Sequence, residues 1–87
     1  MRKIRKLLVA NRGEIACKII KTAKKLNIPT LTIYSDEDIN SIHVSLADEA
    51  INIPGSNVSD TYMNSLAIIN ICKKYKANAI HPGYGLL

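Results

Sequence analysis

The sequence contains no phenylalanine and no tryptophan, and aromatic residues make up only 5% of its 87 positions. The apolar residues are mainly aliphatic instead, with fourteen isoleucines. Isoleucine favours buried strands and the helices that cover them, so we expect an aliphatic core in one small domain. The lack of aromatics also argues against a groove for single-stranded nucleic acid, in which bases stack on rings.

Long hydrophobic runs are missing as well. No apolar stretch approaches the roughly 18 residues needed to span a bilayer, and the first one begins by Leu7, which leaves no room for a cleavable signal. We therefore predict a cytoplasmic protein with no membrane partner. Cysteine is scarce, with only Cys17 and Cys72 far apart in sequence, a spacing that fits neither a metal site nor a disulfide framework. Both should be reduced and partly buried.

The net charge of +5 raises the question of a nucleic-acid partner. Many of the cations lie on the polar side of one predicted helix, namely Lys18, Lys21, Lys24 and Lys25. Cations near the end of a helix are favoured by its dipole whatever the protein binds. We predict a solvated basic face without nucleic acid and keep a basic interaction or nucleic-acid module as an alternative.

Hydrophobic periodicity predicts alternating strands and helices. The expected strands cover 6–10, 30–34 and 50–53, with a connection and a short fourth strand within 76–80, and the expected helices cover 14–26, 39–46 and 61–75. This βαβαβαβ order is typical of an α/β, Rossmann-like parallel sheet with right-handed crossovers and helices on both faces. In the doubly wound order 3-2-1-4, the first and fourth strands are neighbours at the switch point, where ligands bind. The loops 11–13 and 81–85 should therefore meet at one crevice.

The periodicity also predicts which side chains are buried. The first helix should bury Ile15, Ala16, Ile19, Ile20, Ala23 and Leu26. The short helix should bury Ile39, Ile42 and Leu46, with His43 as a packing residue. The last helix, capped by Ser59 or Asp60, should bury Tyr62, Leu66, Ile69 and Cys72.

The loop after the first strand is a weak nucleotide motif. A dinucleotide site needs G-x-G-x-x-G here, and only Gly13 is present. Asp36 imitates a ribose-binding acid, so the dinucleotide-binding lobe of a dehydrogenase stays as a second alternative. Arg12 and Glu14 either brace the crevice, bind a neighbouring domain or belong to a plain turn.

The loop His81-Pro82-Gly83-Tyr84-Gly85 has the composition of a binding loop. Proline stops the strand ladder, and the glycines permit backbone angles that other residues resist. Tyr84 is held between them, where its ring can lie against a flat ligand or close the end of the sheet.

Three segments together resemble the start of the biotin carboxylase component of biotin-dependent carboxylases. They are ANRGEIACKIIKTAKKLNIPT, YSDEDINSIHVSLADEA and AIHPGYGLL. The likeness is greatest to the acyl-CoA carboxylase α-subunits of the propionyl-CoA or methylcrotonyl-CoA type, and acetyl-CoA and pyruvate carboxylases share the same segments.

The resemblance implies an ATP-dependent ligase that activates bicarbonate as carboxyphosphate and carboxylates biotin on a carrier domain. Residues 1–87 would be an incomplete lobe that precedes the ATP-grasp region, because the family continues with a further helix and strand. ATP, Mg (or Mn) and the catalytic groups would belong to later parts, so the fragment alone would be inactive and bind no cofactor or metal. The implied partners are its own ATP-grasp region, the biotin carboxyl carrier domain and a carboxyltransferase subunit, with a homo-oligomer left open.

The resemblance also assigns roles to loop residues. Tyr84 would lie against the biotin ring, and Gly83 and Gly85 would shape that edge. Residues that support the loop without touching biotin would be His81, Asn11, Arg12, Gly13 and Glu14. Lys21 and Lys25 stand where the family commonly has arginine and glutamate in dimer contacts, which puts that dimer geometry in doubt.

Overall fold

The computed structural model describes residues 3–83. Within this range, four strands form one parallel sheet. The strands are β1 (Leu7–Val9), β2 (Thr30–Tyr34), β3 (Glu49–Asn52) and β4 (Ala79–His81). Their order across the sheet is β3-β2-β1-β4. The predicted doubly wound order is therefore confirmed, and β1 and β4 are neighbours.

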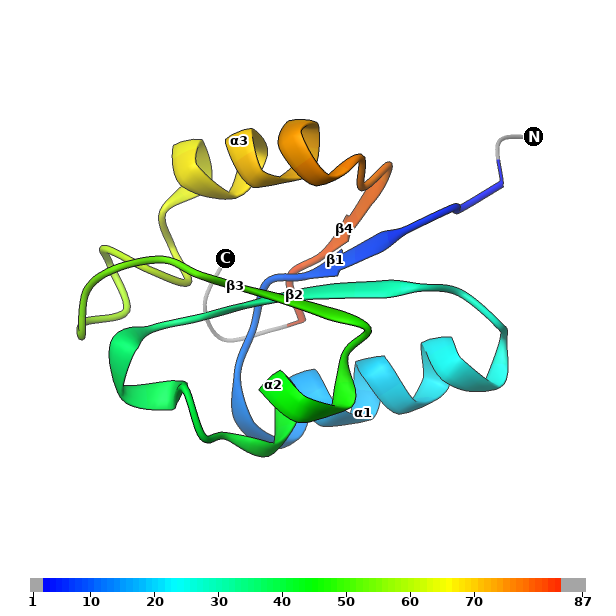
Figure 1. Cartoon of the computed structure of the whole chain (residues 1–87), viewed down its shortest axis with the longest axis horizontal. Helices are drawn as coiled ribbons and strands as arrows, with labels where there is room; N and C mark the ends of the chain where they lie inside the picture. The colour runs from blue at the N-terminus through cyan, green and yellow to red at the C-terminus, as the bar shows by residue number, and fades with distance from the viewer. Residues whose placement is uncertain (1–2, 84–87) are drawn as a thin grey trace.

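The helices lie on both faces of the sheet, as predicted (Figure 1). They are α1 (Gly13–Lys25), α2 (Ile42–Leu46) and α3 (Ser65–Tyr75), with a 3₁₀ turn η1 at Asp36–Asp38. Helices α1 and α2 cover one face and α3 covers the other (Figure 1). This division follows from right-handed crossovers, because the chain winds outward from β1 to β3 and then returns to the other side of β1.

The core has two layers, one on each side of the sheet. On the α3 side, Leu8 packs with residues of β2 and with Tyr62 and Ile68. On the α1 side, Leu7 and Val9 pack against Ala16 and Ile20. All three residues of β1 are buried, as expected for a strand covered on both faces.

Helix α1 matches its prediction closely. Ala16, Ile20 and Ala23 are buried, the lysines of the basic face are exposed, and Glu14 forms an exposed pair with Lys18. Leu26 is the error, because the helix ends at Lys25 and the Leu26 side chain is 65% exposed.

The segment after α1 turns through a left-handed residue. Asn27 has φ of 57°, a left-handed conformation that asparagine adopts more readily than most residues after the end of a helix. The two cysteines are free and partly buried as predicted, and they lie on helices that cover opposite faces.

Helix α3 corrects two predictions. It begins at Ser65, and Asn64 caps it by accepting a hydrogen bond from the backbone N–H of Ala67 at 3.1 Å. The residues before it form turns, in which the hydroxyl of buried Thr61 donates to the Asn57 carbonyl. The Tyr62 hydroxyl donates to the Asp38 carboxylate. The cap predicted at Ser59 or Asp60 is therefore wrong.

The buried face of α3 also differs from the prediction. Leu66 is 72% exposed and Ile69 is 45% exposed, whereas Ile68 is buried and Ile71 and Cys72 are partly buried against the core. The true face is displaced around the helix from the predicted one. Tyr62 is buried as predicted, although it precedes the helix.

The helix predicted over 39–46 is shorter in the structure, because Ile39 follows η1 directly and α2 begins only at Ile42. Ile39 and Ile42 are exposed, while His43 is 1% exposed and its Nε2 lies 3.1 Å from the Ile33 carbonyl oxygen. The packing role of His43 is confirmed, and the predicted burial of the two isoleucines is wrong.

No helix within residues 3–83 is long and apolar enough to cross a membrane.

Candidate functional site

The loops that follow β1 and β4 meet at the carboxyl edge of the sheet, as predicted. The backbone N–H of Ala10 donates to the His81 carbonyl at 3.0 Å. One residue further, the Asn11 side-chain amide donates to the Pro82 carbonyl at 2.7 Å. Consecutive bonds therefore join the two loops at the switch point.

Asn11 is the centre of this junction. Its side chain is buried, and its Oδ1 accepts a hydrogen bond from the Arg12 backbone N–H at 2.8 Å. Among residues 3–83, the amide thus accepts a bond from the β1 loop and donates one to the β4 loop. Its orientation is set by these partners, because an amide rotated by 180° would present a donor to a donor.

Gly83 lies directly against Asn11. It has φ of +67°, and a Cβ at this position would lie 2.7 Å from Asn11 Nδ2 and 2.8 Å from Ile15 Cγ2. Both the backbone angle and the space therefore require glycine. The role of Gly83 in shaping a biotin-facing edge stays a prediction.

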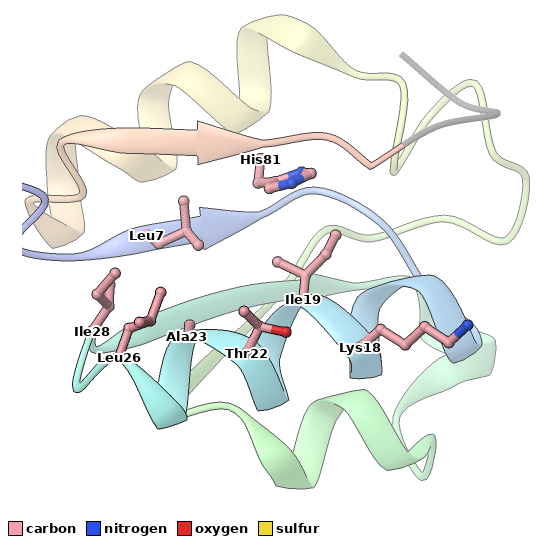
Figure 2. A pocket seen from close by; sticks show the side chains of 8 residues that line it. All are labelled: Leu7, Lys18, Ile19, Thr22, Ala23, Leu26, Ile28 and His81. Atoms are coloured by element: carbon pink, nitrogen blue, oxygen red, sulfur yellow. The ribbon is translucent and has the colours of Figure 1, made fainter.

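His81 closes the same loop from the other side. Its Nδ1 accepts a hydrogen bond from the Gly83 backbone N–H at 3.0 Å. The side chain also lines a hollow of about 300 Å³ between β4 and α1, whose other lining residues are mainly apolar (Figure 2). These residues are Leu7, Lys18, Ile19, Thr22, Ala23, Leu26 and Ile28.

Arg12 takes part in a polar cluster that the sequence did not predict. Its guanidinium donates to Asp38 Oδ1 at 2.6 Å, and the Tyr62 hydroxyl donates to Asp38 Oδ2 at 2.6 Å. The Ser35 backbone N–H in turn donates to the Tyr62 oxygen at 3.2 Å. Arg12 therefore links the β1 loop to η1, and the bracing role considered for it stays a prediction.

The cluster is buried enough to shift pKa values. Burial alone would raise the pKa of Asp38, but hydrogen bonds from Arg12 and Tyr62 lower it below its ordinary value. Burial, followed by the hydrogen bond to Asp38, raises the pKa of Tyr62 to about 12. At neutral pH the cluster is therefore a carboxylate held by a cation and a neutral phenol.

The remaining predicted residues are placed less centrally. Gly13 begins α1 with φ of 63° and its missing Cβ faces open space, so the backbone angle alone requires glycine there. Glu14 is exposed and pairs with Lys18, and within residues 3–83 it makes no bond to the β4 loop. Tyr84 and Gly85 lie outside the described residues.

The acid considered for ribose binding is occupied by the protein itself. Asp36 Oδ1 accepts from the Asn52 side chain and Oδ2 accepts from the Gly55 backbone N–H, each at 3.1 Å. Its carboxylate thus closes the loop after β3. Within the described part of the chain, no group of three His, Cys, Asp or Glu residues is placed to hold a metal ion.

The fold and this edge define an α/β protein of the doubly wound class, with a glycine-containing loop seated at its switch point. Comparison with known families matches residues 3–87 to the family described as "Biotin carboxylase, N-terminal domain". The chain belongs to this family.

Curated relatives give the same result. The chain is 52% identical over 82 residues to the mouse (Mus musculus) mitochondrial propionyl-CoA carboxylase alpha chain, covering 94% of this chain and 11% of the relative. It is 48% identical over 84 residues to the rice (Oryza sativa subsp. japonica) mitochondrial methylcrotonoyl-CoA carboxylase subunit alpha, covering 97% and 11%. The chain thus spans about a tenth of the length of these relatives.

A solved structure shares both fold and sequence. The biotin carboxylase domain dimer of Hydrogenobacter thermophilus 2-oxoglutarate carboxylase, in complex with MgADP, ADP and bicarbonate, has a TM-score of 0.93. It is 42% identical and covers 100% of this chain and 19% of that one. The comparisons support neither the dehydrogenase lobe nor the nucleic-acid module.

Proposed function

We propose that this chain is the N-terminal part of a biotin carboxylase that uses ATP and bicarbonate to carboxylate biotin on a carrier domain. The carboxylated biotin would then feed the carboxylation of an acyl-CoA. The observation that carries this proposal is the match of residues 3–87 to the family, together with relatives named as acyl-CoA carboxylase alpha chains. The activity belongs to a longer polypeptide, since the chain spans only 11% of those relatives.

Within that enzyme, the role of this chain is to present the loop 81–85 to biotin. Biotin supplies the ureido nitrogen that accepts the carboxyl group. Tyr84 would lie against its ring, with Gly83 and Gly85 on either side. The support for this role is the seat that Asn11 and Ile15 provide for Gly83 at the ligand-binding edge of the sheet.

ATP, its Mg (or Mn) ions and bicarbonate would be held by the ATP-grasp region and later parts of the polypeptide. The solved relative that contains MgADP and bicarbonate is consistent with this division, because it is about five times longer than the segment matched here. The 87 residues alone would then be inactive and would bind none of these groups.

The proposed partners follow from the same division of labour. They are the ATP-grasp region of the same polypeptide, the biotin carboxyl carrier domain, a carboxyltransferase subunit and a second copy of the enzyme. We also propose that residues 1–87 are an incomplete lobe. Within residues 3–83 β4 is an edge strand with Ile80 44% exposed, and sheet edges of this kind are usually covered. The predicted cytoplasmic location remains a proposal beside relatives named as mitochondrial.

The experiment that tests the function uses the full-length protein that carries this chain. We expect ATP cleavage that depends on bicarbonate and increases when free biotin is added. A protein that cleaves ATP without any dependence on bicarbonate or biotin would contradict the proposal. Comparing carboxylation of propionyl-CoA and methylcrotonyl-CoA by the enzyme with its carboxyltransferase would identify the acceptor.

The loop is tested by Tyr84→Ala in the same protein. The biotin-dependent step should weaken more than the ATP cleavage measured without biotin. Equal losses in the two rates would instead assign Tyr84 a structural role at the end of the sheet.

A further inference from the structure

Two asparagines join β1 to β4, one at each end of the strand pair. Asn11 follows β1 at the carboxyl edge and donates to the Pro82 carbonyl at 2.7 Å. Asn78 precedes β4 at the opposite edge, where its Oδ1 accepts from the backbone N–H groups of Arg5 and Lys6 and its Nδ2 donates to the Lys3 carbonyl at 2.9 Å. Each side chain both accepts from one segment and donates to a carbonyl.

The two junctions differ in what they hold. Asn78 is exposed and fastens the approach to β1. Asn11 is 2% exposed, and it fastens the peptide that links Pro82 to Gly83, immediately before Tyr84. The chain therefore leaves the sheet through the Pro82–Gly83 peptide, and Asn11 holds the carbonyl of that peptide by a hydrogen bond.

Asn11 also restricts the loop by packing against Gly83, in addition to its hydrogen bond to Pro82. With φ of +67°, Gly83 turns the chain against Asn11 Nδ2 and Ile15 Cγ2, where no Cβ fits. A backbone seated this closely cannot change direction without moving the Asn11 amide. The His81 ring limits it further, because its Nδ1 accepts from the Gly83 N–H at 3.0 Å.

Asn11 is itself held from behind by its neighbour. Its Oδ1 accepts from the Arg12 backbone N–H at 2.8 Å, and Arg12 is anchored to Asp38 by its guanidinium at 2.6 Å. Asp38 is 5% exposed and is bonded to Tyr62 as well, so the anchor belongs to the core rather than to a free surface chain. The amide is thus fixed relative to the sheet before any ligand arrives.

We propose that Asn11 is the positioning residue for the biotin-facing loop, setting the direction in which the chain leaves Gly83. This inference rests on the proposed function. In the proposed reaction Asn11 contacts no reacting atom. It acts on the loop by holding the Pro82 carbonyl and by packing against the Gly83 backbone. Binding of biotin should therefore depend on the donor of its amide more strongly than cleavage of ATP does.

The test is Asn11→Asp in the full-length protein. The carboxylate keeps an oxygen for the Arg12 N–H but replaces the donor to Pro82 by an oxygen that the carbonyl repels. Losing such a bond with a buried polar partner corresponds to about a tenfold effect. We expect the KM for free biotin to rise about tenfold, with a much smaller fall in bicarbonate-dependent ATP cleavage without biotin.

Asn78→Asp is the matched control, because it makes the same substitution on the same pair of strands at the edge away from the loop. It should leave the KM for biotin and the ATP cleavage rate within about twofold of the parent. Gly83→Ala is the second variant, and it should reproduce the selective rise in biotin KM by displacing the loop from the other side of the same contact. Because the two sites touch, the double variant should show non-additive effects on that KM.

The outcomes separate the inference from the proposed function. If the unsubstituted protein shows no bicarbonate- and biotin-dependent ATP cleavage, the proposed function fails. If it is active but Asn11→Asp and Gly83→Ala lower both rates equally or change neither, the positioning role is wrong. An equal rise in biotin KM for Asn78→Asp would also overturn it, since the effect would then reflect the strand pair as a whole.

Discussion

The Tyr62 hydroxyl is the best place to test whether the Arg12–Asp38 cluster stabilises the fold. Tyr62→Phe keeps the buried ring but removes a donor to Asp38 at 2.6 Å and an acceptor for the Ser35 N–H at 3.2 Å. A hydrogen bond to a charged group contributes about 1.5–3 kcal/mol and a neutral one about 0.5–1.5 kcal/mol. Because the neutral bond is long, we expect a total loss of about 3 kcal/mol.

That loss is large for a domain of this size. At about 0.05–0.15 kcal/mol per residue, the whole chain should have a stability of about 4–13 kcal/mol. The variant should therefore unfold at clearly lower urea concentration, followed by circular dichroism because the chain contains no tryptophan. Tyr75→Phe is the control, since within residues 3–83 the Tyr75 hydroxyl makes no hydrogen bond, and it should cost less than about 0.5 kcal/mol.

The pH dependence gives a second check on the same variant. The lowered pKa of Asp38 means that its contribution is present above its ordinary pKa of 3.8 and is lost as the pH falls through the folded value. Since Tyr62 is one cause of that lowering, the stability difference between parent and variant should shrink as Asp38 becomes protonated. A difference below about 1 kcal/mol at neutral pH, or one that stays constant down to acid pH, would refute the reasoning.

Two further predictions concern stability. Burial lowers the pKa of His43 below 6.5 despite the Ile33 carbonyl and the Asp38 charge, so its neutral form should stabilise the fold above pH 6.5 and this contribution should be lost as the pH falls through 6.5 toward the folded pKa. Urea titrations at several pH values should show that the free energy of unfolding changes less with pH in His43→Gln than in the parent. An unchanged pH dependence would exclude His43 as the cause. Asn64→Ala should cost about 1 kcal/mol by removing the α3 cap, whereas Asp60→Ala should cost less than half as much; the reverse order would restore the cap predicted from sequence.

The order of the sheet could be predicted from sequence because it depends on few, strong rules. Strands separated by helical segments of suitable length must be parallel, and right-handed crossovers then leave few arrangements. The meeting of the β1 and β4 loops followed from that order alone. Its atomic basis, the bond from Asn11 to Pro82, required the structure.

The buried face of α3 could not be predicted for a different reason. Nearly every position from Leu66 to Cys72 is apolar, so helical spacing fits the predicted stripe through Ile69 as well as the real one through Ile68. The choice is made by tertiary contacts, since Ile68 belongs to the core cluster that also contains Leu8 and Tyr62. Local periodicity contains no information about those contacts.

The Arg12–Asp38 pair was missed because its partners are 26 residues apart and belong to different loops. Three acids follow one another at Asp36, Glu37 and Asp38, and composition does not tell which of them turns inward. Only the burial of Asp38 and the placement of Tyr62 distinguish it. A charged loop residue close to a predicted switch point was the one available signal.

Asn11 and Asn78 show why function depends on position in the fold as much as on residue type. Both amides bridge the same two strands, and each accepts from backbone N–H groups and donates to a carbonyl. Parallel strands direct all their carboxyl ends to one edge, so loops that bind ligands gather there and the opposite edge remains structural. The same kind of side chain therefore holds the segment before β1 at Asn78. In our proposal, it positions the biotin-facing loop at Asn11. If the Asn78→Asp control also changes the biotin KM, this distinction between the two edges is wrong.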